Sequence, residues 1–292
     1  MKKVFLLFQL LVFFQYSWSQ SLLDELNSEF LSNADTIFAE ATFKATRLIN
    51  GQSIETVGKN GLNFIISHRF GNLNKGYSNF YGLDESHIRL GLEYGLFDRF
   101  DIGLGRSREQ QLVDGYIKYK ILRQASGAYI MPVTVSYYSA AAIRTDKGLV
   151  VGRHYTVANR LNYVHELLIA RKFSNSFSLQ LMPGIVHRNL TAIKKSPNIV
   201  PFVGVGGRLK LSSRITLNAE YYYNLSKYIA DNYVNPLSIG FDIETGGHVF
   251  QLHFSNSRAM HEKILIPENT NDWLKGDFGF GFNIIRHFGL NN

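Results

Sequence analysis

One long hairpin near the C-terminus restricts the fold most. Residues 237–244 alternate apolar and polar side chains, and residues 249–255 repeat the alternation after a turn that contains Gly246 and Gly247. A period of two is typical of a β-strand with one apolar and one polar face. The same pattern recurs along almost the whole chain, with no helices between the strands to cover either face. This combination is typical of a transmembrane β-barrel, whose apolar face contacts lipid and whose polar face lines the lumen.

The alternation predicts an all-β fold, an antiparallel up-and-down transmembrane β-barrel of about twelve strands. Only residues 21–42, with a broken apolar stripe and an acidic face, predict a helix, and these form a short N-terminal helical arm. The predicted strands lie at about residues 62–70, 87–94, 100–105, 114–121, 129–137, 161–173, 177–181, 203–211, 215–223, 237–244, 249–255 and 276–288.

The connections between these strands alternate in length. Short segments rich in Gly, Ser, Asp or Asn join every second pair of strands, and most of the intervening connections are long. The predicted short turns are residues 97–99, 123–127, 174–176, 212–214 and 245–247. The predicted loops are residues 71–84, 107–112, 139–154, 188–198, 225–235 and 257–275. Outer-membrane barrels have this layout, with short turns in the periplasm and long loops outside.

The N-terminus predicts export. Residues 1–19 resemble a secretory signal peptide, because Lys2 and Lys3 precede an apolar run that is too short to span a bilayer as a helix. Residues 20–58 then form a periplasmic arm, which either leads into the first strand or folds into the barrel mouth as a plug. Residues 59–292 form the barrel. We therefore expect the cell outer membrane as the location.

Composition agrees with a membrane barrel and excludes several other classes. The 22 Phe and 16 Tyr fit a lipid-facing band with aromatic girdles. The chain has no Cys, which excludes disulfides, and we expect no cofactor and no metal. The net charge is +8, but the basic residues are scattered, so we expect no nucleic-acid partner. The expected partners are outer-membrane lipid, a small solute, and a periplasmic or surface protein.

The polar phase of the strands predicts which charged side chains line the lumen. Six basic and six acidic residues share this phase, together with one histidine. Two interpretations follow: a network of ion pairs that fills a closed barrel, or a polar pore for a small solute. The residues are Arg69, Arg89, Glu93, Asp101, Asp114, Lys118, Lys120, Arg208, Lys210, Glu220, Asp242, Glu244 and His253.

Catalysis finds little support in the sequence. His253 and Ser255 lie two residues apart on one strand, a spacing that faintly resembles outer-membrane phospholipases. Those enzymes present the pair to lipid, whereas here the neighbouring Phe250 and Phe254 occupy the lipid face. We therefore predict that His253 and Ser255 point inward and that the protein is not an enzyme, with a lipid hydrolase as a distant alternative. The nine histidines lack compact metal-ligand spacing.

Several segments together resemble a known family. They are residues 43–52, 66–71, 95–99, 248–257 and 278–283. From about residue 43 to the C-terminus the chain resembles Gram-negative β-barrel proteins that are classed only as a domain of unknown function. The resemblance implies an outer-membrane barrel and carries no catalytic residues. The leading functional hypothesis is a pore or transporter for a small solute, and the alternative is a closed barrel that anchors a periplasmic or surface partner.

Overall fold

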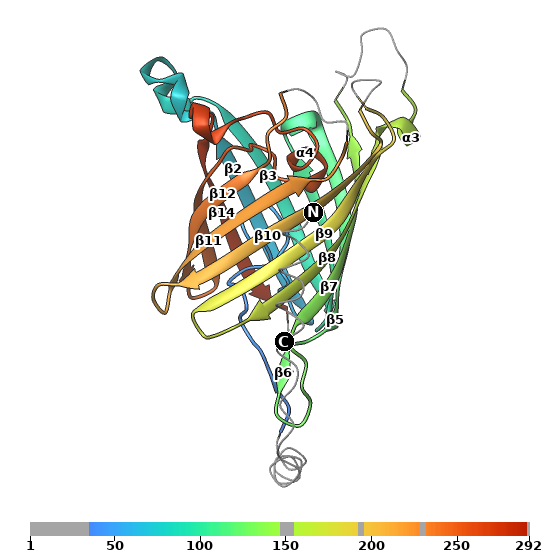
Figure 1. Ribbon diagram of the computed structural model, residues 1–292, viewed down its shortest axis with the longest axis vertical. Helices are drawn as coiled ribbons and strands as arrows, with labels where there is room; N and C mark the ends of the chain where they lie inside the picture. The colour runs from blue at the N-terminus through green and yellow to red at the C-terminus, as the bar shows by residue number, and fades with distance from the viewer. Residues whose placement is uncertain (1–34, 147–154, 192–195, 228–231, 291–292) are drawn as a thin grey trace, which may run out of the picture.

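The computed structural model describes residues 35–146, 155–191, 196–227 and 232–290. Twelve antiparallel strands form a closed barrel (Figure 1), as the alternation predicts. The barrel strands are β2 (Gly61–Phe70), β3 (Ser86–Phe97), β4 (Phe100–Ser107), β5 (Leu112–Leu122), β7 (Thr134–Arg144), β8 (Leu161–Lys172), β9 (Phe177–Arg188), β10 (Ile199–Lys210), β11 (Ile215–Asn224), β12 (Leu237–Thr245), β13 (His248–Ser255) and β14 (Gly279–Gly289).

Each barrel strand pairs with the next one in the sequence, apart from β6, which stands outside the barrel. The barrel closes where β14 pairs with β2, from Gly281 opposite Arg69 to Gly289 opposite Gly61. A closed ladder leaves no unpaired strand edge within the bilayer, where no water can satisfy backbone groups. The ladder is also complete without the residues that precede β2.

The outer wall is apolar and exposed. Leu90, Leu104 and Phe241 belong to a band of outward side chains whose exposed fractions reach 66% at Leu104, as expected for a surface that contacts lipid. Aromatic rings gather at both ends of this band. Phe70 stacks on Phe280 at the end that carries the long loops. Phe97 packs against Phe100 at the end that carries the short turns, so girdles flank the band on both sides.

Short turns and long loops occupy opposite ends of the barrel, which we call the short-turn end and the long-loop end (Figure 1). The long-loop end carries two one-turn α-helices, α3 (Val157–Arg160) and α4 (Glu262–Leu265). It also carries four 3-10 helices, which are η1 (Leu73–Lys75), η2 (Tyr77–Gly82), η3 (Glu109–Gln111) and η4 (Trp273–Lys275). No helix among the described residues is long and apolar enough to cross a membrane.

The fifth predicted strand is misplaced. The prediction of a strand over residues 129–137 is wrong at its start, because β7 begins at Thr134 and continues to Arg144. Residues 139–144 belong to the strand and not to a loop. They are mostly small side chains, so they alternate weakly in hydropathy. The turn predicted at 123–127 extends to residue 133 and contains β6 (Ala125–Ser126), so it is not tight.

Residues 35–42 are not helical, so the prediction of a helix over residues 21–42 is wrong at its described end. Ile37 and Phe38 form β1 (Ile37–Phe38), which pairs with β6. This pairing explains the extended backbone, because β6 offers a free edge beyond the barrel at the short-turn end (Figure 1). The predicted signal peptide and most of the predicted helix lie outside the described residues.

Candidate functional site in the barrel interior

The arm enters the lumen between residues 42 and 57 and turns back inside it. The N–H of Leu48 donates to the carbonyl of Gly51, and the N–H of Ser53 donates to the carbonyl of Thr46. Arg47 and Gln52 face each other in an isolated bridge. Residues 42–43 and 45–54 are buried, although they belong to no barrel strand. We call residues 43–57 the plug segment.

Glu220 on β11 anchors the tip of the plug segment. Its carboxylate accepts hydrogen bonds from the backbone N–H groups of Ile49 at 3.2 Å, Asn50 at 2.8 Å and Gly51 at 3.1 Å. Three N–H donors on one carboxylate stabilise its charge without a cation beside it. A side chain predicted to line the lumen therefore binds the backbone of the same chain.

Amide side chains from other strands bind the plug segment in the same way. Gln251 donates to the Leu48 carbonyl at 2.8 Å, and Asn283 donates to the Ile49 carbonyl at 2.8 Å. The Gln180 side chain both accepts and donates, since it accepts from the Ile54 N–H at 2.8 Å and donates to the carbonyl of residue 52. These contacts come from β9, β13 and β14. The plug segment is therefore bonded to strands on several sides of the lumen.

The charged wall residues also bind the plug segment more than one another. Lys118 donates to the carbonyls of Thr46 at 3.3 Å and Ser53 at 3.4 Å. The hydroxyl of Thr46 donates to Glu93, and the backbone N–H of Val57 donates to Asp101 at 3.1 Å. Lys118, Glu93 and Asp101 therefore contact the plug segment, and Glu93 also lies 4.0 Å from Arg47 of that segment.

Two of the predicted lumen residues form an ion pair with each other. Arg89 on β3 and Asp114 on β5 are 2.5 Å apart, and both are almost fully buried. Asn50 of the plug segment reaches a further wall cation, Arg69, which donates to its side-chain oxygen at 2.8 Å. The charges of Arg89 and Asp114 thus neutralise each other.

Wall glycines make room for the plug segment. A Cβ at Gly206 would lie 2.4 Å from Leu48, and a Cβ at Gly51 would lie 1.6 Å from the hydroxyl of Tyr222. Real Cβ atoms do not approach other atoms so closely, so alanine at either position requires neighbouring atoms to move. Gly206 of the wall and Gly51 of the plug segment therefore allow Leu48 and Tyr222 to pack closely against them.

The loop between β13 and β14 enters the lumen from the opposite end. Residues 259–266 are buried, including all four residues of α4. Leu265 and Ile266 join the same apolar cluster as Phe43, Leu48 and the inward side chains of β7 to β10. The barrel interior between the two mouths is thus filled from both sides by the chain itself.

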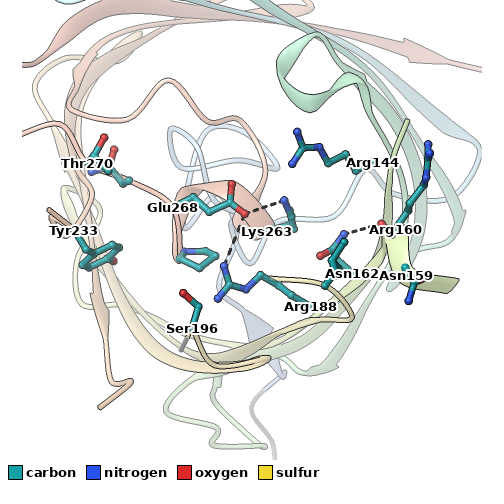
Figure 2. Close-up of a pocket in the computed structure, with 13 residues that line it drawn as sticks. Arg144, Asn159, Arg160, Asn162, Arg188, Ser196, Tyr233, Lys263, Glu268 and Thr270 are labelled. Carbon is teal, nitrogen blue, oxygen red and sulfur yellow. Dashed lines mark hydrogen bonds and ion pairs between the residues drawn. The ribbon is translucent and has the colours of Figure 1, made fainter. Parts of the chain in front are cut away.

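A cavity of about 310 Å³ remains at the long-loop end, which we call the vestibule (Figure 2). It lies between the ends of β7, β8 and β9 and the segment that follows α4. Lys263 donates to Glu268 at 2.9 Å, and Arg188 approaches the same carboxylate oxygen at 3.9 Å. Burial lowers the pKa of the Lys263 ammonium, and the Glu268 carboxylate opposes that change. The residues that line the vestibule are Arg144, Asn159, Arg160, Asn162, Arg188, Leu190, Ser196, Tyr233, Lys263, Pro267, Glu268, Asn269 and Thr270.

The predicted lumen residues separate into two groups by position. Lys210 and Glu244 are exposed at the short-turn end, and Lys120 is half-buried there beside Glu55, with which it forms an ion pair. Asp242 lies inside and accepts from Gln251. The residues buried inside the barrel are Arg69, Arg89, Glu93, Asp101, Asp114, Lys118, Arg208, Glu220, Asp242 and His253.

His253 and Ser255 point inward and are buried, as predicted. The Ser255 hydroxyl accepts from Ser238 at 2.8 Å, so it belongs to a polar cluster with the arm and not to a pair with His253. Burial also gives the phase of β8, the sixth predicted strand, which carries charged residues in both phases of its alternation. Glu166 faces the lumen, and His165 faces outward with its Nδ1 2.7 Å from the Tyr137 hydroxyl.

Sequence reasoning missed the vestibule residues. Arg144 and Arg188 end the inward phases of β7 and β9, so extending each alternation by a few residues would have found them. Lys263 and Glu268 lie in a long loop with no periodicity. No pattern in the sequence indicates that this loop folds back into the barrel.

Comparison with known proteins agrees with this architecture. A family model described as "Membrane bound beta barrel domain (DUF5777)" matches residues 43–288. The chain belongs to this family. The match begins at the plug segment, so it covers that segment as well as the barrel. A membrane-bound barrel with an apolar outer band and aromatic girdles is an outer-membrane protein.

Several solved structures match the chain at low identity. The NanC porin is 9% identical, with a TM-score of 0.49, over 78% of this chain and 100% of the porin. An outer membrane channel from Pseudomonas putida F1 is 8% identical, with a TM-score of 0.49, over 80% of this chain and 98% of the channel. Outer membrane phospholipase A from Escherichia coli is 9% identical, with a TM-score of 0.41, over 89% of this chain and 96% of the phospholipase. No curated protein matches the sequence.

Proposed function

We propose that this protein is a gated outer-membrane channel for a small solute, closed in the described conformation by its own plug segment. The observation that carries the proposal is the order of spaces along the barrel axis. The vestibule lies at the long-loop end, and cavities of about 340 and 400 Å³ border the arm at the short-turn end. Between them the lumen is filled by the plug segment and residues 259–266.

The contacts that hold the plug segment can be exchanged. Its hydrogen bonds to Glu220, Gln180 and Gln251 join side chains to peptide groups, and water can replace either partner. The plug segment pairs with no barrel strand, so it can leave the lumen without breaking the pairing between the strands of the barrel. Burial of Leu48 and Ile54 opposes that departure, at about 1.5–3 kcal/mol for each side chain. The closed form is therefore the resting state.

A second function is favoured by the ribbon of β1 and β6. This ribbon projects beyond the barrel at the short-turn end (Figure 1) and exposes Ile37, Tyr129 and Ile130. Exposed apolar side chains outside the lipid band are typical of an interaction surface. Under this alternative the barrel stays closed and anchors a periplasmic protein.

Deleting residues 21–58 separates the two functions. The measurement is single-channel conductance in a planar bilayer, with heat-dependent mobility on gels as the test that the barrel is folded. The channel proposal expects rare openings for the full chain and steady openings for the folded deletion variant. A folded deletion variant that stays silent but no longer binds a periplasmic partner contradicts the channel and supports the anchor.

A further inference from the structure

The vestibule carries more positive than negative charge. Arg144, Arg160, Arg188 and Lys263 contribute four cationic groups to its lining, and Glu268 contributes the single carboxylate. Arg144 also pairs with Asp146, just outside the lining, through two hydrogen bonds, one of them 2.8 Å long. Counting Asp146, the cations still outnumber the carboxylates among the described residues. Cationic walls around a small cavity attract anions, because low-dielectric walls focus the field.

The vestibule already holds one carboxylate, which belongs to the chain. One oxygen of Glu268 lies 2.9 Å from Lys263 and 3.9 Å from Arg188. The other oxygen accepts from the Gln110 side chain at 2.6 Å. Figure 2 shows Lys263 and Arg188 both directed at Glu268. The geometry of this cluster is therefore suitable for an oxyanion.

We propose that the vestibule binds the carboxylate or phosphate group of a small organic anion, with Arg188 and Lys263 as its principal ligands. Glu268 stands where part of that anion binds, and it competes with the anion for both cations. The role of this site in transport rests on the proposed channel function, whereas binding itself does not.

Size and position restrict the ligand further. A volume of about 310 Å³ is at the lower end of small-molecule sites, which span about 300–1,000 Å³. Asn162, Tyr233 and Thr270 add polar groups that can bond to hydroxyl or carbonyl groups of the ligand. The site lies within the ring of strands in Figure 2, whereas lipid contacts the outside of that ring. We therefore assign a free solute and not a lipid headgroup.

The guanidinium of Arg188 is held in place for this role. Its Nη2 donates to the Pro197 carbonyl at 2.8 Å, while its Nη1 is directed at Glu268. A planar guanidinium fixed on one side presents its remaining donors in a set direction, which favours a planar or tetrahedral oxyanion. Lysine at this position would keep the charge but lose the forked geometry.

Calorimetric titration of the full-length detergent-solubilised protein tests the assignment. The probes are succinate and inorganic phosphate, with glycerol as the neutral control and vesicles of anionic phospholipid as the lipid arm. We expect saturable binding of at least one small anion and none of glycerol. Arg188→Gln and Lys263→Gln should each weaken that binding about tenfold or more, because each removes a charge-assisted hydrogen bond. Binding only of the lipid vesicles, or no binding at millimolar anion, overturns the proposal.

Two matched variants sharpen the test. Glu268→Gln should tighten anion binding several-fold, because it removes the competing carboxylate and keeps the side-chain volume. Arg214→Gln changes the net charge as Arg188→Gln does, but Arg214 is exposed in the turn between β10 and β11, at the opposite end. It should leave binding unchanged. Weaker binding by Glu268→Gln, or equal loss in Arg214→Gln and Arg188→Gln, would show that the vestibule is not the site.

The binding and conductance measurements test the vestibule site and the channel proposal separately. Anion binding by a protein that never conducts leaves the vestibule site standing and removes the channel. Conductance without anion binding removes the vestibule site and leaves the channel. Should Arg188→Gln fail to fold, Arg188→Lys keeps the charge and should still weaken binding through the lost forked geometry.

Discussion

Two regions of the lumen, its deep interior and its long-loop end, contain similar side chains with different roles. Deep in the barrel, Glu220 is surrounded by backbone N–H groups of the plug segment and is almost fully buried. At the long-loop end, the side chain of Glu268 is 28% exposed and lies between Lys263 and Arg188 beside a cavity. The Glu220 carboxylate binds the backbone of the same chain, whereas the Glu268 carboxylate occupies a site that faces solvent. A charged residue in the lumen is therefore no sign of a solute path until its partner is known.

The largest effect is expected at Glu220. Glu220→Gln should loosen the plug segment by about 3 kcal/mol, because charge-assisted hydrogen bonds are lost and an amide N–H₂ group faces backbone donors. Hydrogen exchange at the amides of Asn50 and Gly51 measures this directly. Glu268→Gln is the matched control, since it makes the same substitution at the long-loop end and should leave those amides protected. Equal loss of protection in both variants would mean that Glu220 does not hold the plug segment more firmly than Glu268 does.

A smaller effect is expected where the plug segment packs against the wall. Gly206→Ala places a Cβ 2.4 Å from Leu48 and should destabilise the closed form by about 1–3 kcal/mol, the usual result of overpacking. Gly207→Ala, at the next residue but on the outer face, places a Cβ 3.1 Å from Leu179 and 3.8 Å from the Ser178 carbonyl, and it should change little. Exchange protection of the plug segment should recover when Leu48→Ala is added to Gly206→Ala. Lack of recovery would mean that Leu48 does not pack there.

The smallest effect is expected at the rim. Lys44 pairs with Glu244 at the short-turn end, where the Glu244 side chain is 48% exposed. Glu244→Gln should cost about 1 kcal/mol or less, because solvent screens an exposed pair. The same exchange experiment measures it. An effect as large as that of Glu220→Gln would imply that the arm is held at its entrance and not at its tip.

The barrel could be predicted from sequence because its signal is local. Alternation over β2, β3, β12 and β13 gave the correct inward and outward faces, since each strand carries its own period of two. The prediction failed at β7, where the small residues between Ser139 and Ile143 weaken the alternation. It also failed at Ile37 and Phe38, where pairing with β6 overrides local helix preference.

The lumen filling could not be predicted in the same way because its contacts are distant in sequence. Glu220 and Asn50 are 170 positions apart, and Asn283 and Ile49 are 234 apart. The plug segment has no regular period that would reveal what it binds. The sequence showed which side chains point inward, but not that the chain itself would be their main partner.

The central claim is that the plug segment closes the lumen and can be released from it. Because the chain has no cysteine, the double variant Leu48→Cys with Gly206→Cys contains a single pair of cysteines. Leu48 Cγ lies 3.4 Å from an ideal Cβ at residue 206, a close approach that suits a disulfide. Conductance of one bilayer is recorded before and after a reductant is added, with each single-cysteine variant as a control. We expect a silent oxidised protein that opens intermittently once reduced. Equal conductance in the oxidised and reduced protein would contradict the claim.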